Sequence, residues 1–311
     1  MTACAIGLDV GGTRLSAGLV DTRGALLAHA QESTPPDGPA ATNVLRRLTL
    51  ELAERARRGG HDLLGVGVGF GGPVDYGDQS IVMSHHVGGW ETGLKLAQQL
   101  AEGLGLPAML DNDANCGGLA EALFGAGCGH RSVLYVNIGT GIGGALVLAG
   151  RVHHGAHSIA GELGHCVVKP DGPPCTCDKE GCLEALASGS ALGREGRLAG
   201  LGQHITGREV AQLALEGDAT AGRIVDEAAG WLGLALGNAA NLWDPDVIVL
   251  GGGVAEMGER LLEPTRRSYQ RTAMLSAKAT PIVCASLGYA AGVIGAAALL
   301  FAPCDAAAGS A

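Results

Sequence analysis

Residues 8–20, LDVGGTRLSAGLV, have a counterpart about half a chain later in residues 136–148, VNIGTGIGGALVL. In each stretch an apolar run rich in β-forming residues meets a glycine-rich turn and then a second apolar run, which predicts a β-hairpin. Either stretch alone indicates only a hairpin. A supersecondary unit that recurs after half the chain is expected of two duplicated α/β domains, and the repeat therefore predicts an α/β fold in two lobes.

The length and charge of the chain narrow the class of protein further. A chain of 311 residues has the length of two ordinary domains. Lys and Arg total 21 against 31 Asp and Glu, and the net charge of −10 disfavours nucleic acid as a partner. No apolar run reaches the ~20 residues that span a bilayer. The N-terminus has no basic patch before its apolar run, as a signal peptide would. We therefore expect a cytoplasmic protein with no membrane partner.

A second informative stretch is residues 161–184, GELGHCVVKPDGPPCTCDKEGCLE. Its glycine and proline content indicates a loop that needs outside support. A metal ion would supply that support, because four residues here could form the Cys₃His shell of a structural zinc: His165, Cys175, Cys177 and Cys182. The alternative is a disulfide with buried thiols, which a reducing compartment disfavours. The C-x-C spacing is tighter than the usual C-x₂-C, so both readings stay open, with the metal favoured. Cys166 is interpreted as a core residue.

The order G-E-x-G-H, C-x-C and G-C-x-E in this stretch resembles the ROK family of sugar kinases and related repressors. The family has glycine where this chain has Asp178. Aspartate tolerates left-handed backbone better than most residues, so we expect the turn to be retained. The resemblance extends over nearly the whole chain and implies an actin-like (ribonuclease H-like) fold with an interdomain active-site cleft. It implies a small lobe of residues 1–112, onto which a C-terminal helix (290–311) packs, and a large lobe of residues 113–289 with the zinc loop.

The resemblance also implies an ATP site with Mg²⁺. The D-x-G-G-T sequence of the first hairpin resembles the first phosphate loop of the actin-like sugar kinases, with Arg14 where the family usually has lysine. Glycine amides and a threonine hydroxyl can approach phosphate oxygens closely, and Asp9 can hold Mg²⁺ through water. The second hairpin would hold the phosphates from the opposite side, and a triple-glycine turn after a buried strand would lie against adenosine. The implied nucleotide-binding residues are Asp9, Gly11, Gly12, Thr13, Gly139, Thr140, Gly141, Gly251, Gly252 and Gly253.

The sugar site is implied by residues 111–115, DNDAN, at the junction of a predicted strand and helix. Asn and Asp are favoured helix caps, which is one explanation for them. The family's N-D-A-N box lies here, however, and its Asp is the general base, so Asp113 is expected to take a proton from a sugar hydroxyl. The resemblance places the sugar on Gly72, Asn112, Asp113, Glu162, His165 and Glu184. A minor role at most is expected for His86, and His153, His154 and His157 are interpreted as ordinary loop residues.

Together these features predict an ATP-dependent hexokinase, a phosphotransferase of carbohydrate metabolism, that converts glucose to glucose 6-phosphate in glycolysis. It would use Mg²⁺ with ATP, carry structural Zn²⁺ and form a homodimer or homotetramer. Fructose, mannose, N-acetylmannosamine or N-acetylglucosamine remain possible substrates, and polyphosphate a possible donor. A sugar-sensing repressor is a further alternative. Family repressors carry a helix-turn-helix domain ahead of the kinase fold, and here the first phosphate strand begins at Ala3, which leaves no room for one.

The apolar periodicity predicts where the longer elements lie. We expect helices over residues 40–58, 92–104, 114–124, 183–198, 208–215, 219–242 and 289–301, and a last strand over residues 281–284.

Overall fold

The computed structural model describes residues 2–84 and 87–301, so His86 lies outside the described residues. The chain divides into two compact units. Unit 1 comprises residues 1–131, 145–160 and 289–311, and unit 2 comprises residues 132–144 and 161–288. The first boundary thus lies after residue 131, whereas we predicted it after residue 112. The difference arises because the helix that begins at Asp113 packs against the C-terminal helix of unit 1.

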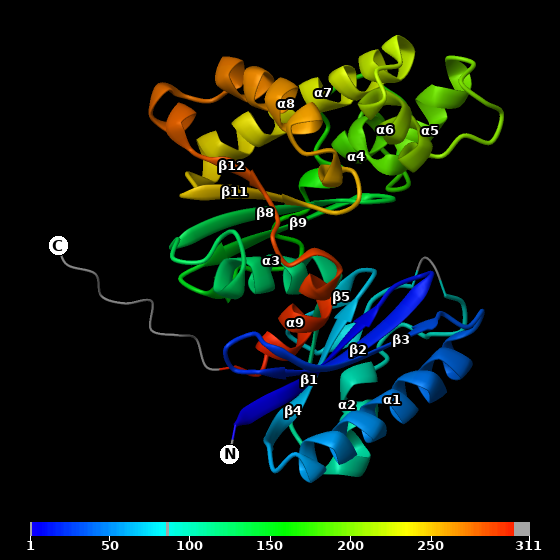
Figure 1. Cartoon of the computed structure of the whole chain (residues 1–311), viewed down its shortest axis with the longest axis vertical. Helices are drawn as coiled ribbons and strands as arrows, with labels where there is room; N and C mark the ends of the chain where they lie inside the picture. Colours follow the sequence, from blue (N-terminus) through cyan, green and yellow to red (C-terminus); the bar gives the residue numbers. More distant parts are fainter. Residues whose placement is uncertain (1, 85–86, 302–311) are drawn as a thin grey trace. The chain divides into compact units, whose positions relative to one another are not determined.

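The sheet of unit 1 has five strands in the order β3-β2-β1-β4-β7. Figure 1 labels the first four of these. The first three strands form an antiparallel meander, and β4 and β7 run parallel to β1. A short hairpin, β5–β6, follows β4. The core behind these strands includes Leu8, Val66 and Val68. The strands are β1 (Ala3–Val10), β2 (Arg14–Asp21), β3 (Leu26–Ser33), β4 (Asp62–Phe70), β5 (Val74–Asp75), β6 (Ser80–Ile81) and β7 (Ala108–Asn112).

Helices cover this sheet. In α1, buried residues recur at helical spacing (Leu45, Leu48, Leu52), and Asp37 caps its start by accepting from the Ala40 amide at 2.8 Å. The C-terminal helix α9 lies against β1 and β4, so closely that a Cβ at Gly67 would stand 1.8 Å from the Ala296 carbonyl oxygen. The elements are α1 (Gly38–Arg58), α2 (Leu96–Ala101) with the single turn η1 (Glu102–Leu104), α3 (Asp113–Phe124) and α9 (Ala291–Ala298).

The second sheet repeats this topology, with the order β10-β9-β8-β11-β12. If the strands of each sheet are numbered by their order along the chain, the spatial order across both sheets is third, second, first, fourth and fifth. In both, the fourth strand is parallel to the first and the fifth. The duplication predicted from the two glycine-rich hairpins is therefore present in the fold. The strands are β8 (Ser132–Ile138), β9 (Ile142–Leu148), β10 (Arg151–Val152), β11 (Val247–Gly251) and β12 (Ile282–Cys284).

Unit 2 is rich in helices, and its core gathers on the long helix α7 with residues such as Leu232 and Leu236. The single helix predicted over residues 183–198 is in fact two. The backbone of Ser188 is extended, and its hydroxyl accepts from the Ala191 amide at 3.2 Å, which begins a new helix. The elements are α4 (Leu183–Ala187), α5 (Gly189–Leu198), α6 (Gly207–Leu215), α7 (Ala219–Trp243), α8 (Glu259–Thr272) and the single turns η2 (Leu163–His165), η3 (Ala255–Met257) and η4 (Leu275–Ala279).

Among the described residues, none of the helices combines the length and the apolar character that crossing a membrane requires.

Candidate active site and metal centre

Two acidic residues of unit 1 lie at the carboxyl ends of two parallel strands, β1 and β7, which flank β4. Asp9 of β1 is in register with Gly69 of β4, which is in register with Asp111 of β7. Asp113 follows two residues later, as the first residue of α3. A Cβ at Gly71 would lie 3.7 Å from an oxygen of Asp113 and 3.8 Å from the Gly11 Cα. The first phosphate turn, the loop after β4 and the predicted base are thus brought together in one unit.

The burial of Asp9 and the negative charge of Asp113 have an electrostatic consequence. Burial, and then the negative charge of Asp113, raise the pKa of Asp9 from 3.8 to about 7. A site that disfavours its own negative charge in this way gains from a bound cation, because the cation compensates the charge. This is the chemistry expected of a residue that holds Mg²⁺, directly or through water.

We expect Asp9 to make the metal-free protein less stable as pH rises. The pKa of Asp9 is higher in the folded state than in the unfolded chain, so the folded state binds the proton more tightly. The free energy of unfolding should therefore fall between pH 4 and pH 7, by at most about 4 kcal/mol. Asp9→Asn removes this loss. Urea unfolding should show the variant more stable than wild type at pH 8 and nearly equal at pH 4.

The matched control for this measurement is Glu91→Gln, which neutralises an exposed carboxylate of the same unit. Its unfolding free energy relative to wild type should not depend on pH in this way. Saturating Mg²⁺ and nucleotide should shrink the difference between wild type and Asp9→Asn at pH 8, because the ligands bind the folded wild-type site more tightly than the site that lacks the Asp9 carboxylate. An Asp9→Asn effect of equal size at pH 4 and pH 8 would contradict the assignment.

The segment from Asp111 to Asp113 is held by a local network. Asn112 is the N-cap of α3, and its side-chain oxygen Oδ1 accepts from the Ala114 amide at 2.9 Å. Its side-chain nitrogen donates to the Gly72 carbonyl at 3.2 Å, so two predicted sugar-binding residues are in contact. One oxygen of Asp113 accepts from the Ala114 amide at 2.8 Å. The capping role therefore belongs mainly to Asn112.

In unit 2, the glycine turns predicted to hold the nucleotide lie against one another. Gly189, at the start of α5, donates its amide to the Gly139 carbonyl at 2.8 Å, and the Val254 amide donates to the Ile138 carbonyl at 2.9 Å. The turn after β8 thus contacts both α5 and the residue that follows the triple glycine 251–253. Neither contact is local in sequence, and together they explain how residues 139–141 and 251–253 come to lie side by side.

Glu184 links the second glycine turn to the cysteine loop, the part of residues 161–184 that carries the cysteines. One of its oxygens accepts from the Ile142 amide at 2.9 Å, and the other lies 3.3 Å from the Thr176 hydroxyl, which donates to it. The residue is therefore oriented by two unit 2 segments. Each carboxylate oxygen can accept a second hydrogen bond, so the network leaves Glu184 able to receive a sugar hydroxyl.

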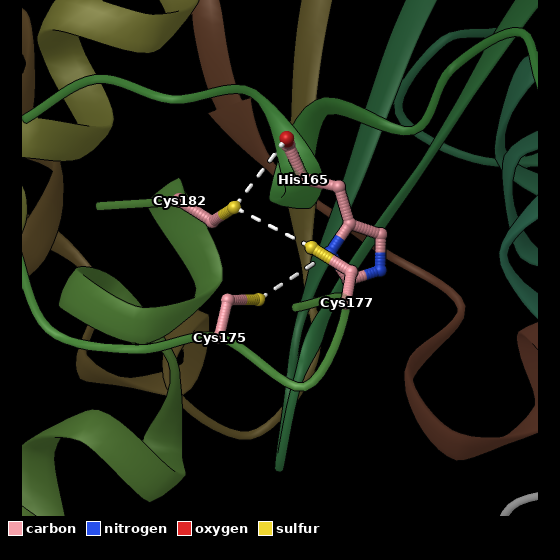
Figure 2. Close-up of side chains that lie close together, drawn as sticks. All are labelled: His165, Cys175, Cys177 and Cys182. Carbon is pink, nitrogen blue, oxygen red and sulfur yellow. Dashed lines mark hydrogen bonds between the residues drawn. The ribbon is translucent and has the colours of Figure 1, made fainter. Parts of the chain in front are cut away.

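The four predicted zinc ligands converge (Figure 2). Their ligand atoms all lie within 4.8 Å of one another. Cys175 Sγ is 3.6 Å from His165 Nδ1, and Cys177 Sγ is 3.6 Å from Cys182 Sγ. Tetrahedral zinc with ordinary bond lengths needs about 3.6 Å between nitrogen and sulfur and about 3.8 Å between two sulfurs. A disulfide would need about 2.05 Å. The geometry fits a Cys₃His zinc site and not a disulfide.

The loop backbone shows why this arrangement forms. Asp178 has φ +63°, the left-handed conformation expected when it replaces the family's glycine, and its amide donates to the Cys175 carbonyl at 3.2 Å. Lys179 Nζ donates to the His165 carbonyl at 2.9 Å. Burial is the largest cause that raises the pKa of Cys182, to about 12, so this thiol keeps its proton near neutral pH until a metal ion displaces it.

The two ring nitrogens of His165 face different partners. Nδ1 faces Cys175, whereas Nε2 lies 4.0 Å from a carboxylate oxygen of Glu162. A histidine that gives Nδ1 to a metal presents Nε2–H as a donor. Glu162 is 46% exposed, so this donor and this carboxylate remain accessible to a polar ligand.

Two expectations about individual residues were wrong. Cys166 is exposed, not part of the core: it ends the turn η2, where the backbone becomes extended. His154 is not an ordinary loop residue: its side chain is 15% exposed and its Nε2 lies 2.7 Å from Asp111 Oδ2. The partners are 43 positions apart in the sequence, and no local pattern joins them. His153 and His157 are exposed, as expected of loop residues.

Comparison with known proteins gives a consistent result. The model of the ROK family matches residues 5–302. A glucokinase of Halalkalibacterium halodurans is 36% identical over 93% of this chain and 92% of its own length. The crystal structure of a ROK hexokinase from Thermus thermophilus is 40% identical, with a TM-score of 0.81 over 94% of this chain and 96% of its own. A ROK glucokinase from Streptomyces griseus, in complex with glucose and AMPPNP, is 33% identical, with a TM-score of 0.81 over 96% and 99%.

Regulators are also among the similar proteins. The xylose repressor of Bacillus subtilis is 26% identical over 84% of this chain and 67% of its own length. The glucokinases are therefore matched over almost their full length, whereas a third of this repressor has no counterpart here.

Proposed function

Because the chain belongs to the ROK family and has its actin-like (ribonuclease H-like) α/β fold, we propose that this sugar kinase is an ATP-dependent hexokinase that converts glucose to glucose 6-phosphate. The observation that carries the proposal is the meeting of Asp9, the first glycine turn and Asp113 at one edge of the unit 1 sheet. The full-length similarity to glucokinases supports the choice of sugar.

Phosphoryl transfer asks a protein mainly for positioning and charge control. Asp113 takes the proton of the sugar 6-hydroxyl as that oxygen attacks the γ-phosphorus. The carboxylate suits this role, because one of its oxygens is fixed by the Ala114 amide and its helix is also capped by Asn112, which accepts from the Ala114 and Asn115 amides. Mg²⁺ bound with ATP neutralises phosphate charge, and Asp9 is the residue that would hold it. Backbone amides of the glycine turns orient the phosphates.

The remaining sugar hydroxyls are assigned to two groups of residues, one in each unit. Asn112 and the Gly72 backbone form one pair in unit 1. Glu162, His165 and Glu184 form another group in unit 2, fixed by the cysteine loop and the second glycine turn. Carboxylates suit this task, because each can accept several hydroxyl hydrogen bonds. Zinc, for which the four ligand residues fit, would hold the loop in shape and would not take part in the transfer.

Other hexoses and another donor are alternatives within the same chemistry. Fructose, mannose, N-acetylmannosamine and N-acetylglucosamine present the same primary hydroxyl, and the sugar-binding residues do not discriminate among them by type. Polyphosphate could replace ATP, although the Gly251–Gly253 turn favours a nucleotide. A sugar-sensing repressor is the alternative from another class, and it is disfavoured by a net charge of −10.

A coupled assay over these five hexoses, with ATP or polyphosphate as donor, tests the proposal. We expect glucose with ATP to give the highest kcat/KM. A higher kcat/KM with another hexose would change the substrate but keep the reaction. Absence of phosphorylation of any hexose, together with salt-sensitive, sequence-specific DNA binding, would favour the repressor instead. Analytical ultracentrifugation of the same sample would show whether the protein is the expected homodimer or homotetramer.

A further inference from the structure

We propose that His154 is a positioning residue for Asp113 and that it acts through the buried carboxylate of Asp111. The inference rests on the proposed kinase function, because it concerns how the base of that reaction is held. His154 comes from the loop after β10, about 40 residues beyond the segment that it would position. All of the residues involved belong to unit 1.

The carboxylate of Asp111 joins three segments of the chain. Its Oδ1 accepts from the Asn112 amide at 2.7 Å and from the Asn115 side-chain nitrogen at 2.8 Å. Its Oδ2 lies 2.7 Å from His154 Nε2. The side chain of Asp111 is only 2% exposed, so water cannot replace a lost partner fully. Asp113 lies between the two residues that the Oδ1 atom holds.

His154 is itself held in place. Its ring stacks on the ring of Tyr76, with centroids 3.5 Å apart and planes inclined by 13°. The Ala160 amide donates to the His154 carbonyl at 3.1 Å, and the Tyr76 amide donates to the Ser158 hydroxyl at 3.0 Å. The loop of residues 153–160 is therefore attached to Tyr76 at two points. An imidazole held by this stacking in an attached loop can orient a carboxylate, which a freely rotating side chain could not.

This arrangement predicts that removal of the His154 imidazole displaces the base, Asp113, and so lowers kcat more than it changes substrate binding. Without the imidazole, one oxygen of the buried Asp111 carboxylate loses its partner, and the Asp111–Asn115 contact at the first turn of α3 relaxes. Asp113 sits in that turn. Displacement of a catalytic group by about 1 Å can cost about 10²-fold in rate. We expect His154→Leu to lower kcat by about 10- to 100-fold, with the KM for ATP changed by less than about threefold.

Two amide variants separate the hydrogen bond from the packing. His154→Gln places its amide nitrogen near the position of Nε2 and can still donate to Asp111, so it should keep most of the wild-type kcat. His154→Asn is one methylene shorter, so its amide does not reach Asp111 and it should resemble His154→Leu. This pair tests whether the hydrogen bond to Asp111 is needed, even if the leucine variant does not fold. His157→Leu, an exposed histidine of the same loop, is the control that should leave kcat unchanged.

The deciding experiment is a double-mutant cycle in the hexokinase assay, on variants shown to be folded by thermal unfolding. If His154 acts through Asp113, His154→Leu should lower kcat in the wild-type background but have almost no effect on the residual rate of Asp113→Asn. Equal fold losses in both backgrounds, or a His154→Asn variant as active as His154→Gln, would overturn the proposal. Wild-type protein that phosphorylates no hexose would instead refute the proposed function, so the two failures are distinguishable.

Discussion

Asp113→Asn should lower kcat by about 10²- to 10⁴-fold while the affinity for the sugar stays within a few-fold of wild type. Asparagine has nearly the shape of aspartate and can accept the Ala114 hydrogen bond, but it cannot take a proton at neutral pH. The cap of α3 is supplied by Asn112, so the helix should be unaffected. The measurement is steady-state kinetics with glucose and ATP, alongside glucose binding by calorimetry on the same folded variant.

Asp37→Asn is the matched control for this prediction. Asp37 also stands at the start of a unit 1 helix, where its side chain caps α1 by accepting from the Ala40 amide. Asparagine caps about as well as aspartate, so stability should change little and kcat should not change. If Asp113→Asn keeps kcat within a few-fold of wild type, Asp113 is a structural residue and another group must be the base.

The second large effect is expected from the metal centre. Cys177→Ala, or removal of zinc by a chelator, should weaken glucose binding by roughly tenfold or more and leave ATP binding nearly intact. The reason is geometric. One of the four ligands, His165, is itself a predicted sugar-binding residue, and the same loop carries Glu162 and contacts Glu184 through Thr176. Loss of one ligand weakens the metal bonds that hold the four side chains together, and the loop loosens.

Three measurements on one sample test this prediction: metal content by mass spectrometry, glucose affinity and nucleotide affinity. Cys166→Ala is the matched control, because Cys166 adjoins His165 but is exposed and is not among the four converging ligands. It should retain zinc and full glucose affinity. A folded, zinc-free Cys177→Ala protein that binds glucose as tightly as wild type would show that the metal does not orient the sugar-binding residues.

The local parts of this architecture could be predicted from the sequence, because local patterns determine them. Glycine-rich turns between apolar runs predicted both hairpins. Their repetition predicted two duplicated domains, and the two sheets do have the same strand order. The spacing of His165 and the three cysteines anticipated a cluster whose distances suit zinc. Asp178 could be read as a left-handed residue because its side chain tolerates that conformation, and its φ is +63°.

The features that escaped prediction depend on contacts between distant residues. Helical periodicity continues through residue 188, and the contact of Gly189 with Gly139 divides the helix there, together with a local cap, the hydroxyl of Ser188. The attachment of α3 to unit 1 depends on its packing against α9. The pairing of His154 with Asp111 joins residues that have no common local motif. In each case a tertiary contact decided what composition and periodicity could not.

The most direct test of the account is phosphorus NMR of the purified protein incubated with glucose and Mg²⁺-ATP. We expect the ATP signals to be replaced by ADP and glucose 6-phosphate in equal amounts, with little free phosphate. ATP that stays intact, or that is hydrolysed to ADP and free phosphate without a sugar phosphate, would contradict the assignment of this chain as a glucose-phosphorylating kinase.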